Sequence, residues 1–147
     1  MTKPCAQCPW RPENVGKPSP WGFYTKRNRT RLWNQVRGGG PQSCHPTDPR
    51  HPDHVAAGAK PGSAPVECAG SVILIIRELR ALQAIAGDGV PINGEHVDHY
   101  LKSRPRGITK QGLIYWMVAR AAGFARGTPM GEPPLPDVDE SVEVCHS

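Results

Sequence analysis

The chain has 147 residues, including 17 prolines and 16 glycines, and only 37% of its residues are hydrophobic. The length suits a single domain, and the composition predicts long irregular segments while falling short of a disordered chain. A formal net charge of +5 favours polyanionic partners such as nucleic acid or acidic protein faces, although it could serve only to keep a small protein soluble.

The first twenty residues contain five prolines, so we expect a loop there rather than a long helix or a central strand. Inside this loop, Cys5 and Cys8 form a Cys-x-x-Cys hook, which Pro9, Trp10 and Arg11 follow directly. Such a hook supplies two thiolates that converge on one metal ion. Trp10 is expected to cover one side of the hook and exclude water from it, or else to belong to a small N-terminal core.

Residues 21–37 predict a short helix whose apolar stripe includes Trp33 and Val36. Its other side is basic, and basic residues interleaved with aromatic ones are typical of surfaces that grip phosphates and stack on bases. The plainer interpretation is a solvated helix face with the aromatic side chains turned inward. Together with a later basic stretch over residues 102–110, the candidate nucleic-acid contacts are Lys26, Arg27, Arg29, Arg31, Arg37, Lys102, Arg104, Arg106 and Lys110.

A second proline-rich loop covers residues 42–66, and Cys44 and Cys68 bracket it. A loop of this length is unusual inside a compact domain unless it is functional or tied down. Cys68 then leads into residues 71–86, the clearest helix prediction, with Ser71 as the expected cap and Gly87 at its end. The dipole of that helix would favour a thiolate at Cys68, which makes this a suitable place for a metal ligand.

Two further helices are predicted over residues 94–103 and 110–122, capped by Asn93 and Thr109. The predicted fold is mainly α: a small, irregular, metal-stapled domain in which a loop-rich N-terminal metal knuckle packs on about three helices. We divide the chain into a four-cysteine metal-binding domain with its core helix over residues 1–87, a helical extension over 88–127, and a proline-rich, acidic tail, either disordered or loosely docked, over 128–147.

The N-terminus shows no apolar stretch behind Met1, and the longest apolar run, residues 72–76, is too short to span a bilayer. We therefore expect a cytoplasmic protein with no membrane partner, whose thiols stay reduced. In that compartment a Cys-x-x-Cys pair indicates a metal or redox element rather than a disulfide, and five cysteines cannot all pair.

Four cysteines satisfy the ligand count of a tetrahedral thiolate site: Cys5, Cys8, Cys44 and Cys68. Mixed sets stay open, because a hook combined with two histidines has the outline of a zinc finger; the alternate ligands are His45, His51 and His54. Zinc is the expected metal, and an iron–sulfur cluster is the alternative because it also takes four thiolates. Glu95, His96, Asp98 and His99 form a weaker candidate, with ordinary surface residues as the plainer interpretation.

The pattern Cys5-x-x-Cys8-Pro9-Trp10-Arg11, then Ser43-Cys44-His45, then Cys68-Ala69-Gly70 before an apolar helix, resembles an uncharacterised family of small proteins from actinobacteria and their phages. The resemblance covers roughly residues 4–85. It implies a metal-binding role for the four cysteines and no established activity. The second half of the chain, from Asp88, lies outside the pattern.

The sequence reveals no catalytic arrangement, and a site closed by four thiolates leaves no open coordination position for a reaction. We therefore expect a binding protein rather than an enzyme. Two functions stay open. The first is a small accessory or regulatory module with a structural zinc ion that binds nucleic acid or a nucleic-acid-associated protein. The second is an iron–sulfur redox or sensor protein.

Overall fold

The computed structural model describes residues 3–4, 8–17, 25–40, 42, 68–122 and 139–146, with the backbone alone for residues 119–122. Within these ranges the chain is helical and forms no strand, which confirms the predicted mainly α class. The elements are the short 3₁₀ helix η1 (Pro12–Asn14) and the α-helices α1 (Lys26–Arg37), α3 (Ala69–Ala86), α4 (Gly94–Ser103) and α5 (Lys110–Ala122). None of these helices is both long and apolar enough to cross a membrane.

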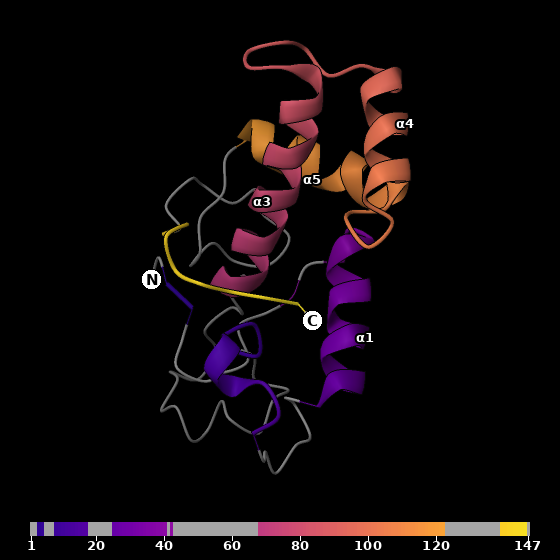
Figure 1. The fold of residues 1–147 in the computed structure, drawn as a ribbon. Coiled ribbons are helices and arrows are strands. Elements are labelled where there is room, and N and C mark those ends of the chain that lie inside the picture. The colour runs from indigo at the N-terminus through magenta and orange to yellow at the C-terminus, as the bar shows by residue number, and fades with distance from the viewer. Residues whose placement is uncertain are drawn as a thin grey trace, which may run out of the picture.

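Helix α3 lies at the centre of the molecule (Figure 1). It packs against both α4 and α1, and Figure 1 shows these two helices one above the other along the same side of α3. Helix α5 crosses behind them. The N-terminal segment with η1 lies near the end at which α3 begins, so Cys68 and the N-terminal residues share one end of the molecule.

Helix α3 begins two residues earlier than the sequence predicts. Its N-cap is Cys68, and the Ser71 hydroxyl donates a hydrogen bond to the Cys68 carbonyl oxygen at 2.9 Å. The helix ends where predicted, before Gly87, whose φ of 103° lies in the left-handed region that favours glycine. The apolar run over residues 72–76 is buried all round, because neighbouring elements cover this part of α3 on every side.

Helix α1 occupies the second part of the segment predicted as helical, and residues 21–24 lie outside the described ranges. Thr25 is its N-cap, and the threonine hydroxyl accepts a hydrogen bond from the backbone N–H of Asn28 at 3.3 Å. Trp33 and Val36 face the interior as predicted, and both are buried.

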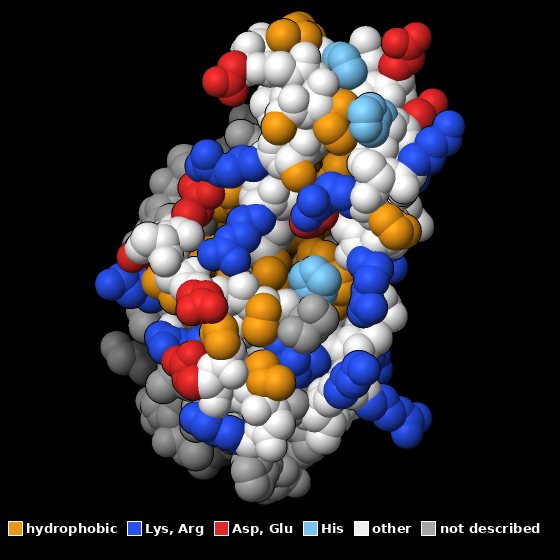
Figure 2. All heavy atoms as spheres, in the orientation of Figure 1, with side chains coloured by type: hydrophobic (Ala, Val, Ile, Leu, Met, Phe, Trp, Pro, Cys, Tyr) orange, Lys and Arg blue, Asp and Glu red, His pale blue; other side chains and the backbone are white. Residues whose placement is uncertain are grey.

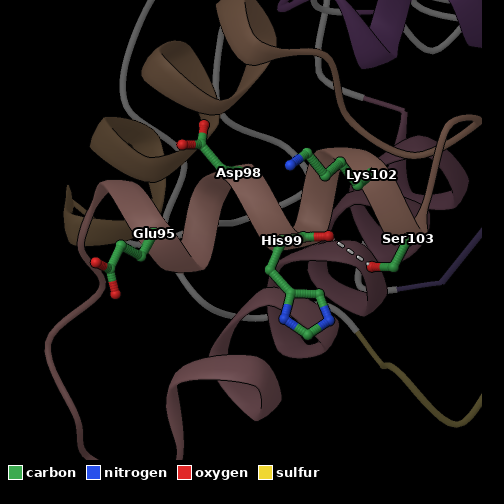
Figure 3. A pocket seen from close by; sticks show the side chains of 5 residues that line it. All are labelled: Glu95, Asp98, His99, Lys102 and Ser103. Carbon is green, nitrogen blue, oxygen red and sulfur yellow. Dashed lines mark hydrogen bonds between the residues drawn. The ribbon is translucent and has the colours of Figure 1, made fainter.

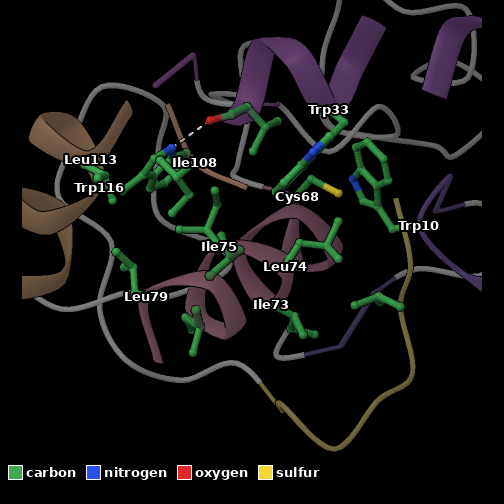
Figure 4. Packing of buried hydrophobic residues seen from close by; sticks show 14 of the residues in the cluster. Trp10, Trp33, Cys68, Ile73, Leu74, Ile75, Leu79, Ile108, Leu113 and Trp116 are labelled. Carbon is green, nitrogen blue, oxygen red and sulfur yellow. Dashed lines mark hydrogen bonds between the residues drawn. The ribbon is translucent and has the colours of Figure 1, made fainter. Parts of the chain in front are cut away.

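A hydrophobic core joins the helices to the N-terminal segment (Figure 4). Three buried tryptophans each donate one hydrogen bond from the indole N–H: Trp10 to Oε1 of Gln42 at 3.0 Å, Trp33 to the Arg106 carbonyl at 2.9 Å, and Trp116 to the Val36 carbonyl at 2.7 Å. Each bond fixes the indole against a segment far away in the sequence. The helical body therefore has an apolar interior of its own, which the modest hydrophobic content of the chain did not lead us to expect.

Asn93 and Thr109 cap α4 and α5, as the sequence predicts. The side-chain oxygen of Asn93 accepts from the backbone N–H of His96 at 3.1 Å, and the Thr109 hydroxyl accepts from the backbone N–H of Gly112 at 3.0 Å. The backbone N–H of Thr109 also donates to the Arg37 carbonyl at 2.9 Å, which joins the start of α5 to the end of α1. A side chain at position 112 would collide with that same carbonyl oxygen, so the contact requires glycine.

Glu78, a buried acid of α3, holds the turn between α4 and α5. Its carboxylate accepts hydrogen bonds from the Tyr100 hydroxyl at 2.9 Å and from Nε of Arg104 at 2.8 Å, and it forms an ion pair with the same guanidinium. Burial acts to raise the pKa of Glu78, but the hydrogen bonds from Arg104 and Tyr100 outweigh burial and hold that pKa below its ordinary value. Glu78 is therefore an ionised anchor between α3 and α4.

Replacing Glu78 with glutamine should lower the free energy of unfolding at neutral pH by about 1–3 kcal/mol, because hydrogen bonds to a charged group are lost. A carboxyl group whose pKa is lowered by folding stabilises the protein above its unfolded pKa, near 4.5, and loses that contribution as the pH falls through the folded value. The stability difference between wild type and Glu78→Gln should therefore shrink in acid. Urea unfolding at about pH 7 and about pH 3 measures it, with the exposed Glu95→Gln as the control. A difference that is the same at both pH values would contradict the assignment.

The C-terminal strap, residues 139–146, lies across the first turns of α3 and runs toward α1 (Figure 1). Arg77 donates to the carbonyls of Val142 and Val144 at 3.1 and 2.9 Å, and Arg80 makes two hydrogen bonds to Glu140 at 2.8 and 2.7 Å. Of the two alternatives predicted for the tail, the structure shows docking rather than disorder for these residues. Guanidinium groups on α3 donate to backbone carbonyls of the strap. Such contacts require no periodic pattern of hydrophobic residues, so the sequence of the strap gives no sign of them. Residues 128–138 lie outside the described ranges.

Candidate metal centre

The residues that follow the Cys-x-x-Cys hook form a tight turn that η1 closes. The Cys8 carbonyl accepts from the backbone N–H of Arg11 at 3.2 Å and from the side-chain amide of Asn14 at 2.9 Å. The Arg11 guanidinium donates to the Pro4 carbonyl at 2.9 Å. Arg11 therefore connects Pro4 to Cys8.

The carbonyls of Pro9 and Trp10 accept hydrogen bonds from distant parts of the chain. Nε of Arg29, on α1, donates to the Pro9 carbonyl at 3.0 Å, and the backbone N–H of Cys145, in the C-terminal strap, donates to the Trp10 carbonyl at 2.8 Å. The Trp10 ring packs edge-to-face on Trp33, with ring centroids 6.4 Å apart. The knuckle, residues 4–14, is therefore attached to α1 and to the strap as well as to α3.

Cys8 and Cys68 lie side by side, although 60 residues separate them in the sequence. Their Sγ atoms are 3.8 Å apart, and the two residues are only 1% and 4% exposed. This separation is too long for a disulfide bond, whose sulfurs lie about 2.05 Å apart. It matches the edge of a tetrahedron of thiolates around zinc, since Zn–S bonds of about 2.3 Å place two sulfurs about 3.8 Å apart.

Gly70, in the first turn of α3, leaves the space that the Cys8 thiol occupies. A Cβ atom at position 70 would lie 2.5 Å from Sγ of Cys8 and 2.8 Å from Cδ1 of Trp10. No side chain other than that of glycine permits so close an approach to the helix backbone. Figure 4 shows the sulfur of Cys68 pointing toward Trp10, so the indole covers the same region.

Gln42 brings the start of the second proline-rich loop to this place. The backbone N–H of Cys68 donates to the Gln42 carbonyl at 2.8 Å, while the Gln42 side chain accepts the indole N–H of Trp10. Gln42 is itself buried. Three segments that are distant in sequence therefore meet at the N-terminal end of α3: residues 8–10, 42 and 68–70.

The remaining predicted ligands lie outside the described residues: Cys5, Cys44, His45, His51 and His54. Within the part of the chain that the structure describes, no three His, Cys, Asp or Glu side chains gather into a possible metal site. The structure thus brings together two of the four predicted cysteines. The full ligand set, whether four cysteines or a mixture with histidine, remains a prediction.

The weaker candidate on α4 does not converge on one point. Figure 3 shows Asp98 projecting from one side of the helix, while Glu95 and His99 project from the other. The fourth member, His96, is engaged locally, because its Nδ1 accepts a hydrogen bond from the backbone N–H of Asn93 at 3.1 Å. These side chains are arranged as ordinary polar residues at the surface of a helix.

The prediction that Arg29 is exposed is wrong. We predicted it on the exposed side of its helix, but the residue is only 3% exposed. In addition to Pro9, its guanidinium donates to the Cys145 carbonyl at 3.0 Å and lies 3.5 Å from the Cys145 sulfur. Arg29 therefore joins the knuckle to the C-terminal strap and is unavailable to a nucleic acid.

Two further predicted contacts are also engaged within the protein. Arg37 donates to the carbonyls of Pro105 and Gly107 at 2.7 Å each, and Arg104 pairs with Glu78. The other six predicted contacts are exposed, and their side chains form no hydrogen bond or ion pair with the described residues: Lys26, Arg27, Arg31, Lys102, Arg106 and Lys110.

The sequence analysis missed the residues that support the site. Asn14, Gln42 and Arg29 all bond to backbone groups beside a cysteine, and each has a common polar side chain with no distinctive spacing. Gly70 gave a usable signal, because glycine inside the first turn of a strongly apolar helix costs stability unless close packing requires it.

Comparisons with known proteins give no match: no family model, no curated protein and no solved structure matches this chain. The resemblance to the actinobacterial and phage family therefore remains a prediction. Function has to be inferred from the residues and their geometry.

Proposed function

We propose that this protein is a small binding module whose N-terminal knuckle is stapled by a structural zinc ion and whose basic surface binds nucleic acid. The separation of 3.8 Å between the buried sulfurs of Cys8 and Cys68 supports the zinc site most directly. Two thiols at this separation form an S–H···S hydrogen bond, and a zinc ion that displaces both protons would bind the two thiolates at the same spacing.

Chain connectivity limits where the other two cysteines can be. Cys5 directly follows Pro4, whose carbonyl accepts from Arg11, and it precedes Cys8 by three residues. Cys44 lies two residues beyond Gln42, so their Cα atoms are at most about 7 Å apart. We infer that Cys5 and Cys44 supply the third and fourth thiolates.

Zinc fits this geometry better than a four-iron cluster does. In such a cluster each cysteine binds a different iron atom, so no two cysteine sulfurs share one coordination sphere. The Cys8–Cys68 separation suits two sulfurs on the same metal, as in a zinc site or on one iron of a 2Fe–2S cluster. Elemental analysis of protein purified without oxygen should give one zinc per chain in a colourless solution. Stoichiometric iron with visible cluster absorption would instead establish the alternative, an iron–sulfur redox or sensor protein.

The nucleic-acid part of the proposal rests on the six exposed cations. Helix α1 carries Lys26, Arg27 and Arg31 on its exposed surface and contains no acidic residue. Figure 2 shows Lys and Arg side chains along the edge that α1 forms, whereas acidic side chains gather elsewhere on that face. Exposed, unpaired cations bind phosphates through release of counterions, which makes binding depend on salt.

Replacing Arg31 with alanine should lower the salt concentration at which the protein elutes from immobilised single-stranded DNA, since one phosphate contact is lost. The matched control is Arg80→Ala, which removes the same charge from a residue that already pairs with Glu140. The control should elute at the wild-type salt concentration or only slightly below it. Equal shifts for the two variants would show that net charge alone governs retention, and would remove the α1 surface from the proposal.

A further inference from the structure

A pocket of about 290 Å³ lies between α3, the α4–α5 turn and the C-terminal strap. We call it the His146 pocket. Its lining residues are Glu78, Ser103, Arg104, Pro105, Arg106, Gly107 and His146. A pocket of this size is at the lower end of the range for small-molecule sites.

The turn that forms one wall is held from behind by several hydrogen bonds. Arg37 donates to the carbonyls of Pro105 and Gly107, and the Trp33 indole donates to the carbonyl of Arg106. Substituting Gly107 would drive a Cβ into Glu78 and Tyr100. The wall therefore exists before any ligand arrives, and a preformed site loses less entropy on binding.

His146 contributes a flat ring to the pocket. Its imidazole stacks on Trp33 with ring centroids 4.3 Å apart and an angle of 6° between the planes. Trp33 covers one face of the imidazole and does not itself line the pocket, so the pocket meets the parts of the ring that Trp33 leaves uncovered. Nδ1 of His146 is buried and has no hydrogen-bond partner, so polar contacts within the protein do not explain the position of the ring.

The charges around the ring favour a neutral aromatic surface beside a cation. Burial lowers the pKa of His146, and the nearby Arg106, Arg29 and Arg37 lower it further, against the opposing effect of Glu78. The charge of Glu78 is already balanced by Arg104. The Arg106 guanidinium, in contrast, is exposed at the edge of the pocket and pairs with none of the described residues.

We propose that the His146 pocket binds one nucleotide of a single-stranded nucleic acid, with the base stacked on His146 and the adjoining phosphate against Arg106. The inference rests on the proposed nucleic-acid function and names its substrate class. A base inside a duplex is covered on both faces and cannot enter such a pocket, whereas an unpaired base can stack on an aromatic ring. Arg106 also belongs to the six exposed cations, so the pocket adjoins the surface proposed to track the phosphates.

The test is fluorescence anisotropy with a labelled single-stranded 12-mer, an otherwise identical 12-mer with abasic positions, and a duplex of the same length. Stacking of one base contributes about 1–3 kcal/mol, so His146→Ala should weaken binding of the intact strand by about tenfold. His146→Phe keeps a flat ring and should bind within about threefold of wild type. The abasic strand should bind wild type about as weakly as the intact strand binds His146→Ala. The duplex should bind more weakly than the intact strand, with no difference between wild type and His146→Ala.

Two outcomes would overturn the pocket and leave the proposed function standing: unchanged binding by His146→Ala, or equal binding of abasic and intact strands by wild type. Absence of salt-dependent binding of any strand by wild type would overturn the nucleic-acid function and the pocket together. Zinc content and thermal unfolding are measured on the same samples, so loss of binding through unfolding is recognised. If His146→Ala disturbs the strap, His146→Phe provides the test, because it keeps a flat ring and should bind within about threefold of wild type.

Discussion

Replacing Cys8 with serine should abolish stoichiometric zinc binding and unfold the N-terminal knuckle. The free energy of zinc binding to such small sites is roughly 10 kcal/mol or more, and in a metal-stapled segment it is folding free energy. Most residues of the hydrophobic core lie on α1, α3, α4 and α5 rather than in the knuckle, so we expect most of the helical circular dichroism to remain. Elemental analysis, the thermal unfolding profile and limited proteolysis measure the three effects.

Cys145→Ser is the matched control for this experiment. Cys145 is attached to the same knuckle through its backbone, while its sulfur accepts a hydrogen bond from the Arg29 guanidinium at 3.5 Å, which a serine hydroxyl can also accept. This variant should keep its zinc and unfold close to the wild-type temperature. Equal loss of zinc in the two variants, or an unchanged unfolding profile and zinc content in Cys8→Ser, would contradict the assignment of Cys8 as a ligand.

Replacing Gly70 with alanine should have the second-largest effect. The added methyl group would lie 2.5 Å from the Cys8 sulfur, so either α3 or the hook must move. Overpacking of this kind costs about 1–3 kcal/mol of stability. Displacing a ligand also weakens metal binding, and changes beside the ligands of a metal site typically cost 10–100-fold in affinity. Chemical denaturation and competition with a chromophoric chelator measure the two losses.

Gly94→Ala is the control for Gly70→Ala. Gly94 is the first residue of α4, and a Cβ atom there would meet nothing within 4 Å. Alanine at this position should leave zinc affinity unchanged and stability unchanged or slightly higher. If Gly70→Ala also left zinc affinity unchanged, the close approach of Cys8 to α3 would have no part in forming the site.

The sequence predicted the helices well because local signals specify them. Asn93 and Thr109 cap α4 and α5 where expected, and the apolar run of α3 marks the centre of the core. The predicted cap, Ser71, lies three residues after the observed cap, Cys68, because serine is the better cap on propensity alone. In the structure the Ser71 hydroxyl turns back to the Cys68 carbonyl, and this leaves the cysteine at the helix terminus.

Contacts between distant segments could not be predicted in the same way. Arg29 looks like its neighbours in a basic helix, and its burial follows only from the position of the Pro9 and Cys145 carbonyls. Arg77 holds the strap by donating to backbone carbonyls, which every residue has, so the sequence does not show which carbonyls it contacts. Cys8 and Cys68 were predicted to belong to one metal site, and the structure places their sulfurs 3.8 Å apart; that they bind a common ion stays a prediction.

X-ray absorption at the zinc edge tests the central claim most directly, because it reports the atoms bound to the metal in the intact protein. Four sulfur neighbours at about 2.3 Å, with no nitrogen or oxygen in the first shell, are the result that the four-cysteine site predicts. A first shell in which nitrogen neighbours at about 2.0–2.1 Å replace two of the sulfurs would contradict it. Protein that binds no zinc at all would contradict the staple itself.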